Sequence, residues 1–373
     1  VRYQGNQDWV YAIEAAVRPF ATCVHPLAVP AGGTAEVRVF GPGVAAGATA
    51  TVATGTASAG RLIRAAPVLG GVPLNSVALF PAVDPIVGEL ATDADPAEFA
   101  LPAVVVGEIG APGEVDRHLF AAKAQEAFSF EVLARRLGSG LDPSLRILRS
   151  DGGVAIEADD ATFDRVLSAD PFVDSWKAPA DGTYVLEIRD LHGRGGAGYP
   201  YAIRATRAEP TFALEMDTDK TLLAPGSAGV IYVRTVRRAG FSGDIQLTID
   251  GLPPGVRAVP GRILATGNDG CIWLQAAPDA ASGWSEVVIG GTATVPEEGG
   301  ASRTIAVRAT PLQEIYMPGG GRGHYPVEGH AVSVSRPMDV RRVAVSTKSI
   351  ELAPGGSQRI DVTVERADDY KGN

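Results

Sequence analysis

The stretch TLLAPGSAGVIYVRTVRRAGFSG, residues 221–243, decides the fold, because the chain repeats it as IELAPGGSQRIDVTVERADDYKG over residues 350–372. The two copies align without a gap, and a fainter third copy, VPAGGTAEVRVFG, covers residues 29–41. Each full copy contains a strand, a Pro-Gly turn and a second strand. Its apolar residues alternate with the period of a half-buried strand. The repeat therefore predicts several related all-β units.

A second repeat has a different pattern. Residues 188–205 read IRDLHGRGGAGYPYAIRA, and residues 1–15 read VRYQGNQDWVYAIEA. Both are typical of a β-hairpin around a Gly-rich turn. We therefore expect the chain to begin inside the last hairpin of one domain and to end within the opening strands of another.

The repeats divide the chain into two alternating kinds of unit, called type A and type B. The predicted fold class is all-β, with tandem antiparallel β-sandwiches, jelly-roll-like in type A and immunoglobulin-like in type B. The predicted segments are 1–16, the C-terminal hairpin of a preceding type A domain; 17–83, type B; 84–208, type A; 209–311, type B; 312–342, a Gly- and Pro-rich linker; and 343–373, the first strands of a further type B domain.

Composition excludes several classes of function. Lys plus Arg is 33 against 43 for Asp plus Glu, giving a formal charge of -10, whereas a nucleic-acid surface needs a basic stripe. No run of 18 apolar residues is present, so no membrane span is expected.

The two cysteines, Cys23 and Cys271, lie in different predicted domains and in strand-like runs. We expect both to be buried free thiols.

The middle of the chain contains stretches in which apolar residues occupy every second position, as they do in the strands of a β-sandwich. Phe128, Phe130 and Val132 form one predicted strand face, and the stretch APADGTYVLEI, residues 178–188, forms another after a turn. Two facing sheets would bury both sets.

Residues 107–208 resemble the bacterial pre-peptidase C-terminal (PPC) domain. The matching phrases are GEIGAPGEVDRHLFAAKAQEAFSFEVLARRLGSGLDPSLRILRSDGG, then EADD, then WKAPADGTYVLEIRDLHGRGGAGYPYAIRA. The resemblance implies a jelly-roll-like sandwich. Such domains alternating with immunoglobulin-like sandwiches look like large exported proteins of planctomycete-type bacteria, which implies a secreted, periplasmic or cell-surface location.

The same resemblance implies a candidate calcium site. Some PPC relatives bind calcium through acidic residues just before the first strand and near its start. The matching positions are Asp93, Asp95 and Glu98, then Glu114 and Asp116, although the Glu-Pro-Asn-Asp phrase common in relatives is replaced here by TDADPAEF.

A second cluster of acidic residues can be found in the sequence without reference to the PPC family. Asp159 and Asp160 stand at the centre of a carboxylate-rich loop, and clustered carboxylates supply the oxygen ligands that calcium requires. The alternative is a solvated loop with Asx turns. The neighbouring acidic residues are Glu157, Asp164, Asp170 and Asp174.

Motifs for nucleophilic, metalloprotease or P-loop chemistry are missing from the sequence. We therefore expect a non-catalytic structural or interaction segment of a large exported or cell-surface protein. Its expected partners are other domains of the same chain or neighbouring surface proteins, and calcium is the one cofactor considered. The alternatives are an accessory glycan- or protein-binding module of a secreted hydrolase, and an enzyme with an unrecognised site.

Overall fold

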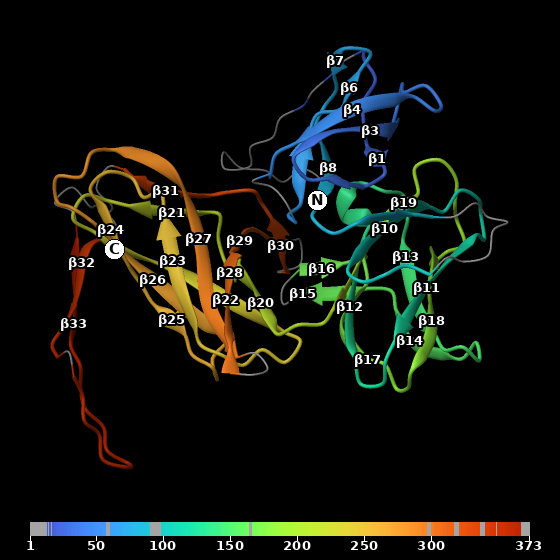
Figure 1. The fold of residues 1–373 in the computed structure, drawn as a ribbon. Coiled ribbons are helices and arrows are strands. Elements are labelled where there is room, and N and C mark those ends of the chain that lie inside the picture. The colour runs from blue at the N-terminus through green and yellow to red at the C-terminus, as the bar shows by residue number, and fades with distance from the viewer. Residues whose placement is uncertain are drawn as a thin grey trace. The chain divides into compact units, whose positions relative to one another are not determined.

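The computed structural model describes residues 13, 15, 17–56, 60–89, 98–163, 166–296, 300–316, 321–335, 340–347 and 349–366. Two compact units, Val1–Glu209 and Pro210–Asn373, divide the chain. Both are built from β-sheets in which most neighbouring strands are antiparallel (Figure 1). The predicted fold class, all-β tandem sandwiches, is confirmed. No helix in the described part of the chain is long and apolar enough to cross a membrane.

The first unit contains two sandwiches, of which the N-terminal one has two sheets, β1-β3-β4-β6-β7 and β2-β8-β5. In β4 every second residue is buried, as the alternation of apolar side chains requires. Valines and leucines such as Val37, Val52 and Leu79 form its core. The strands are β1 (Cys23–His25), β2 (Ala28–Pro30), β3 (Gly33–Phe40), β4 (Thr49–Thr54), β5 (Ile63–Ala65), β6 (Val68–Leu69), β7 (Val72–Pro73) and β8 (Val77–Ala82).

The middle sandwich, which completes the first unit, places sheet β17-β12-β19-β10-β9 against sheet β11-β18-β13-β14. The predicted faces of β12 and β18 are buried in its aromatic core, which includes Phe120, Phe128 and Trp176. Its elements are β9 (Ile86–Gly88), β10 (Ala103–Glu108), β11 (Val115–Ala122), β12 (Ala127–Leu133), the 3-10 helix η2 (Arg135–Leu137), β13 (Pro143–Leu148), β14 (Val154–Ala158), β15 (Ala161–Phe163), β16 (Val166–Ser168), β17 (Phe172–Lys177), β18 (Gly182–Asp190) and β19 (Pro200–Arg207).

The second unit has two six-stranded sheets, one of them β24-β26-β22-β20-β29-β30 and the other β21-β31-β27-β23-β25 with β28 beside β27. The inner faces of these two sheets enclose a single apolar core. The strands are β20 (Thr211–Met216), β21 (Lys220–Leu223), β22 (Ala228–Arg238), β23 (Ile245–Asp250), β24 (Val256–Pro260), β25 (Arg262–Ile263), β26 (Asp269–Ala276), β27 (Gly283–Pro296), β28 (Ser302–Arg308), β29 (Thr310–Tyr316), β30 (Arg322–Pro326) and β31 (His330–Val334).

The predicted linker over 312–342 differs from the structure. Strands β29, β30 and β31 occupy much of that range, and β31 pairs with both β21 and β27. Val332 and Val334 of β31 enter the core, while His330 is buried and hydrogen-bonded to Thr221. The Gly and Pro residues of the range mark the turns of this hairpin and strand, and the alternation HAVSV carries the strand signal. The remaining predicted domain boundaries stay predictions.

Strands β32 (Val340–Val345) and β33 (Val362–Arg366) pair as a hairpin that repeats β20 and β22 at an offset of 129 residues. Leu214 pairs with Thr235 in the first copy, and Val343 pairs with Val364 at the equivalent positions of the second. The sequence repeat is therefore also a repeat of strand register. The predicted hairpin over 1–16 lies almost entirely outside the described residues.

Both cysteines are free thiols. Cys23 is buried, as expected, but Cys271 is exposed. The expectation for Cys271 is wrong because alternate residues of β26 face outward, and Cys271 occupies an outward position.

Candidate functional site

The most elaborate buried arrangement in the first unit is the junction between its two sandwiches. Strand β10 explains how it forms, because the sequence AVVVGE is buried on both of its faces. Ala103 and Val105 point into the core of the middle sandwich, whereas Val104 and Val106 point to the N-terminal sandwich. A strand that must bury both faces reads as a continuous apolar run. The run of valines is the signal in the sequence for this junction.

The apolar residues of the junction form one cluster, called here the junction core. The N-terminal sandwich supplies one set and the middle sandwich the other, and all are nearly inaccessible to solvent. Packing of this kind resembles a protein interior more than a contact between independent domains. The members of the junction core are Cys23, Leu27, Ala28, Phe80, Ala82, Val104, Val106, Leu133, Leu137 and Ala202.

The 3-10 helix η2 presents Leu137 to the junction core and ends at Gly138. Gly138 has φ 85°, a left-handed conformation that favours glycine. A Cβ at this position would lie 2.3 Å from the backbone oxygen of Thr22. The glycine therefore permits both the turn and the close approach of the two sandwiches.

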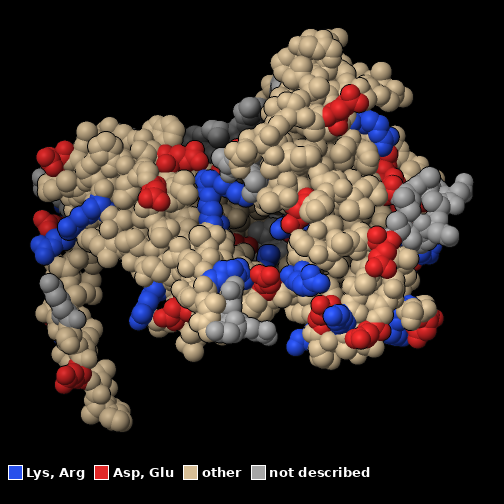
Figure 2. Space-filling model, viewed as in Figure 1, with Lys and Arg blue, Asp and Glu red and all other residues tan. Residues whose placement is uncertain are grey.

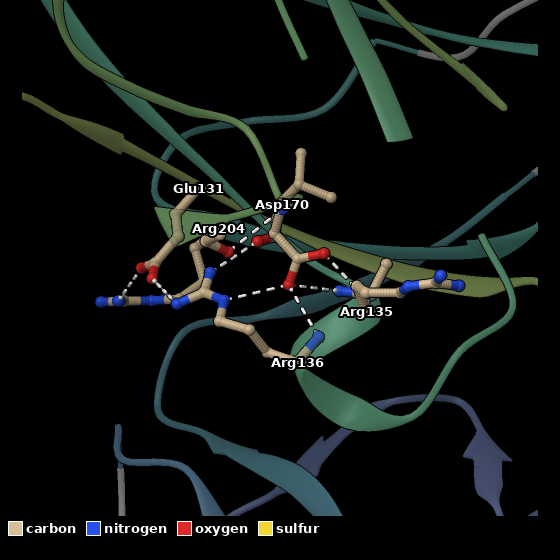
Figure 3. Close-up of polar contacts among 8 residues, drawn as sticks. Glu131, Arg135, Arg136, Asp170 and Arg204 are labelled. Atoms are coloured by element: carbon tan, nitrogen blue, oxygen red, sulfur yellow. Dashed lines mark hydrogen bonds and ion pairs between the residues drawn. The ribbon is translucent and has the colours of Figure 1, made fainter. Parts of the chain in front are cut away.

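Asp170 holds η2 in place through the start of the helix (Figure 3). Its fully buried carboxylate accepts hydrogen bonds from the backbone N–H groups of Ala134, Arg135 and Arg136, at 3.2, 2.6 and 3.1 Å. The guanidinium of Arg136 donates a fourth at 2.9 Å. This arrangement satisfies the free N–H groups at the start of the helix and pairs the buried charge.

Two arginines extend this network to the rim of the junction core. Glu131 pairs with Arg136 at 3.1 Å and with Arg204 at 2.7 Å (Figure 3). The guanidinium of Arg204 also lies 5.1 Å from the ring centroid of Phe80, which belongs to the other sandwich. At a second point, Arg38 of the N-terminal sandwich pairs with Glu108 of the middle sandwich at 2.6 Å.

An unusual pair of carboxyl groups lies at the end of β10, on the face of that strand that carries Val105 and opposite to the junction core. Glu89 and Asp116 hydrogen-bond to each other, which requires one of them to carry a proton. Partial burial, with the charges of Asp116 and Glu114, raises the pKa of Glu89 to about 8. Burial also raises the pKa of Asp116, which accepts a hydrogen bond from the Tyr201 hydroxyl at 2.8 Å.

Glycine at position 107 makes room for this pair. A Cβ there would lie 2.3 Å from a carboxylate oxygen of Glu89 and from the Tyr201 hydroxyl. The Tyr201 hydroxyl also contacts Nε2 of His118 at 3.0 Å, and burial lowers the pKa of His118 to about 4. His118 is therefore neutral near pH 7.

The predicted calcium ligands do not come together as one site. Asp116 starts the edge strand β11, whereas Asp159 and Asp160 follow the opposite edge strand β14. A row of paired residues crosses the sheet from Asp116 through β18 and β13 to Ala158. Three strand spacings separate the row's ends by about 14 Å, too far for one ion.

Each half of the predicted set has its own surroundings. Glu114 accepts a hydrogen bond from the backbone N–H of Ala111 at 2.7 Å, and its charge acts on Asp116. Asp159 accepts one from the N–H of Asp160 at 2.9 Å, a local contact between a side chain and the adjacent backbone. Asp93 and Asp95 lie outside the described residues.

These placements determine whether any of the carboxylates lie close enough together to share one ion. Within the described residues no group of three His, Cys, Asp or Glu side chains is close enough to hold an ion. The calcium assignment stays a prediction. Sequence reasoning missed Glu89, because nothing in GEL, residues 88–90, distinguishes it from a surface acid.

Acidic and basic side chains are interspersed on the visible face of each unit (Figure 2). In the arginine pair at 135–136, the Arg136 guanidinium forms an ion pair with the buried carboxylate of Asp170. Asp170 is correspondingly a structural cap in the structure, although in sequence it stands near the acidic loop.

No protein-family model matches this chain, and no curated protein matches it. One similar solved structure is the M60 catalytic domain with the CBM51-1 and CBM51-2 domains from Clostridium perfringens ZmpB, at 9% identity and TM-score 0.20, covering 96% of this chain and 44% of that one. Another is surface layer protein SbsC, domains 1-6, at 10% identity and TM-score 0.19, covering 93% and 49%. This chain spans less than half the length of each, and similarity this low supports no argument.

Proposed function

We propose that this chain is a non-catalytic structural and interaction segment of an exported or cell-surface bacterial protein. The observation that carries the proposal is the junction core, which fixes two sandwiches to each other. Domains in one chain move relative to each other unless their interface is large and apolar. A dry core rimmed by the Arg38–Glu108 pair and by Arg204 over Phe80 is such an interface.

The assignment of the middle sandwich as a PPC-like domain rests on the sequence resemblance over residues 107–208. The PPC-like phrases over 107–208 fall on the strands of the middle sandwich, and their apolar residues occupy its core. A PPC-like domain joined to immunoglobulin-like sandwiches supports an extracytoplasmic location. Neighbouring surface proteins and other domains of the same chain are the partners we propose.

Calorimetry of the whole chain tests the structural role. We expect the two sandwiches of the first unit to unfold in one transition, because separating them would expose the junction core. Replacing Leu133 by alanine should split or broaden that transition, at a cost of about 2–5 kcal/mol. Two separate transitions for these sandwiches in the unaltered protein would contradict the proposal.

A second candidate function, an accessory glycan- or protein-binding module, has a specific observation in its favour. Val230 on β22, Trp273 on β26 and Val259 on β24 lie in one row across the outer face of a sheet of the second unit. Val230, Val259 and the neighbouring Tyr232 are 40, 57 and 60% exposed. Exposed aromatic and apolar side chains on one face are typical of a binding surface.

Glycan arrays and pull-downs with the whole chain, alongside a Tyr232→Ser variant, test this second role. Binding that the substitution removes would support it. A Thr248→Ser variant, altered elsewhere in the same unit, serves as the matched control. Retained binding in Tyr232→Ser would place the binding surface elsewhere.

Calcium binding is tested separately by thermal unfolding after chelation. A folded-state site raises the Tm when calcium is restored. An increase lost in Asp116→Asn but kept in Asp159→Asn would assign the site to the end of β10, and the converse would assign it to the loop after β14.

A further inference from the structure

A groove lies on the outer face of the second unit, over the neighbouring strands β25, β23, β27 and β28 (Figure 1). Ile245 of β23 and Val295 of β27 point into the core, so the residues beside them in sequence point outward. The groove has a volume of about 360 Å³, within the range of small-ligand sites. Its lining residues are Asp244, Gln246, Arg262, Thr292, Ala293, Thr294 and Thr304.

The strand register brings the polar lining residues together from separate parts of the sequence. Gln246 pairs with Arg262 on one side and with Thr292 on the other. Two residues further along β27, Thr294 pairs with Thr304 of β28. Because residues two apart on a strand share one face, these pairs form two adjacent rows on the same outer surface.

Three threonine hydroxyl groups line one side of the groove. Among the residues that the structure describes, the hydroxyls of Thr292, Thr294 and Thr304 make no hydrogen bond to the protein. A hydroxyl can donate one hydrogen bond and accept two. These groups are therefore available to a ligand that offers both donors and acceptors.

Backbone groups of residues 261–265 hold the other side of the groove in place. Asp244 accepts a hydrogen bond from the N–H of Ala265 at 2.7 Å, and the Gln246 amide donates one to the carbonyl of Gly261 at 3.0 Å. Arg262 lies 3.6 Å from the second carboxylate oxygen of Asp244, too far for a hydrogen bond. The side chains of Asp244 and Gln246 are thus oriented before a ligand arrives, which lowers the entropic cost of binding.

The lining groups select one chemical class of ligand. One carboxylate and one guanidinium balance each other, so the groove has no excess charge for an anion, and a single carboxylate is too few for calcium. The described lining residues include no aromatic or large apolar side chain, which an apolar ligand would need. Hydroxyls, an amide and a weakly paired charged couple instead match a neutral molecule that is rich in hydroxyl groups.

We propose that this groove binds a neutral carbohydrate through hydrogen bonds to its hydroxyl groups. The inference is a specific form of the binding role proposed second above, and it uses a different surface, because Tyr232 lies on the other sheet of this unit. It does not depend on the junction core.

NMR titration of the whole isotope-labelled chain tests the proposal with four neutral hexasaccharides: cellohexaose, maltohexaose, xylohexaose and N-acetylchitohexaose. At least one should shift the amide signals of Thr292 and Thr294 with a Kd below about 10 mM, an affinity that a few hydrogen bonds can provide. The absence of such shifts with all four sugars would overturn the proposal.

Thr294→Val removes one hydroxyl at an exposed strand position and keeps the shape and strand propensity of the side chain. It should weaken binding about three- to tenfold, as expected for one lost hydrogen bond to the ligand. Thr310→Val, at an exposed position of β29 in the other sheet, is the matched control and should bind like the unaltered chain. Asp244→Asn provides a second variant of the groove and should also weaken binding.

The Tyr232→Ser variant separates this groove from the surface considered above. Binding that survives in Tyr232→Ser and weakens in Thr294→Val supports the groove. Binding that is lost in Tyr232→Ser and unchanged in both groove variants would overturn the inference, while it would support the glycan-binding role of the other sheet.

Discussion

At the scale of single residues, the buried carboxylate of Asp170 orders the helix that reaches into the junction core. Removing it would leave three backbone N–H groups without their acceptor and would take one hydrogen bond from the Arg136 guanidinium, which keeps its pair with Glu131. We expect Asp170→Ala to lower the free energy of unfolding by about 3–5 kcal/mol. Denaturant unfolding measures this, with Asp151→Ala on an exposed turn as the control. A loss below 1 kcal/mol would show that the cap is dispensable.

The Glu89 carboxyl should make the stability depend on pH. Its pKa is raised to about 8 in the folded chain, so the folded state holds a proton that the unfolded chain releases at lower pH. Stability is therefore complete below the ordinary glutamate pKa and falls as pH rises toward 8.

Glu89→Gln should remove that dependence and raise stability at pH 8 by about 1 kcal/mol, because solvent around this exposed side chain screens much of the effect. Tm measured from pH 5 to pH 8.5 gives the comparison, and Glu98→Gln serves as control. A Tm that falls equally with pH in both variants would assign the dependence to other groups.

At the scale of elements, the repeat supplies a matched pair of substitutions. Val233→Ala empties space in the core of the second unit and should cost about 1–3 kcal/mol, whereas Val362→Ala at the equivalent exposed position should cost less than 0.5 kcal/mol. Chemical unfolding of dilute samples measures both. Equal losses would mean that β33 is covered in solution.

The alternation of apolar residues predicted strands and their buried faces from the sequence alone. The alternation in Phe128, Phe130 and Val132 places those residues in the core of the middle sandwich, as predicted. It failed at 312–342, where short strands are interrupted by glycine and proline and the pairing partners of β31 lie far away in sequence. Local pattern cannot report such distant pairing.

The candidate site was less accessible from sequence. The valine run of β10 predicts a strand that is buried on both faces. Which surface covers its second face depends on tertiary packing, which the sequence pattern does not specify. Two carboxylates that lie near one another in sequence proved to serve different roles, because Asp170 caps a helix and Glu157 pairs with Arg146.

At the scale of the whole molecule, we infer that the junction core makes the first unit a single rigid body. The residues of the junction core are nearly inaccessible to solvent, and two arginine contacts lie at its rim. Phe80→Ala should loosen this joint without unfolding either sandwich, because Phe80 contributes to the junction core and not to the two domain cores.

The distance distribution between one spin label on each sandwich of the first unit tests this rigidity most directly. Labels at Thr51→Cys and Lys177→Cys, both exposed positions, in a Cys271→Ser background leave the remaining buried Cys23 unlabelled. Electron–electron double resonance should give one narrow distribution in the unaltered chain and a broader one in Phe80→Ala. A broad or multi-peaked distribution in the unaltered chain would contradict a fixed junction, and with it the proposed structural role.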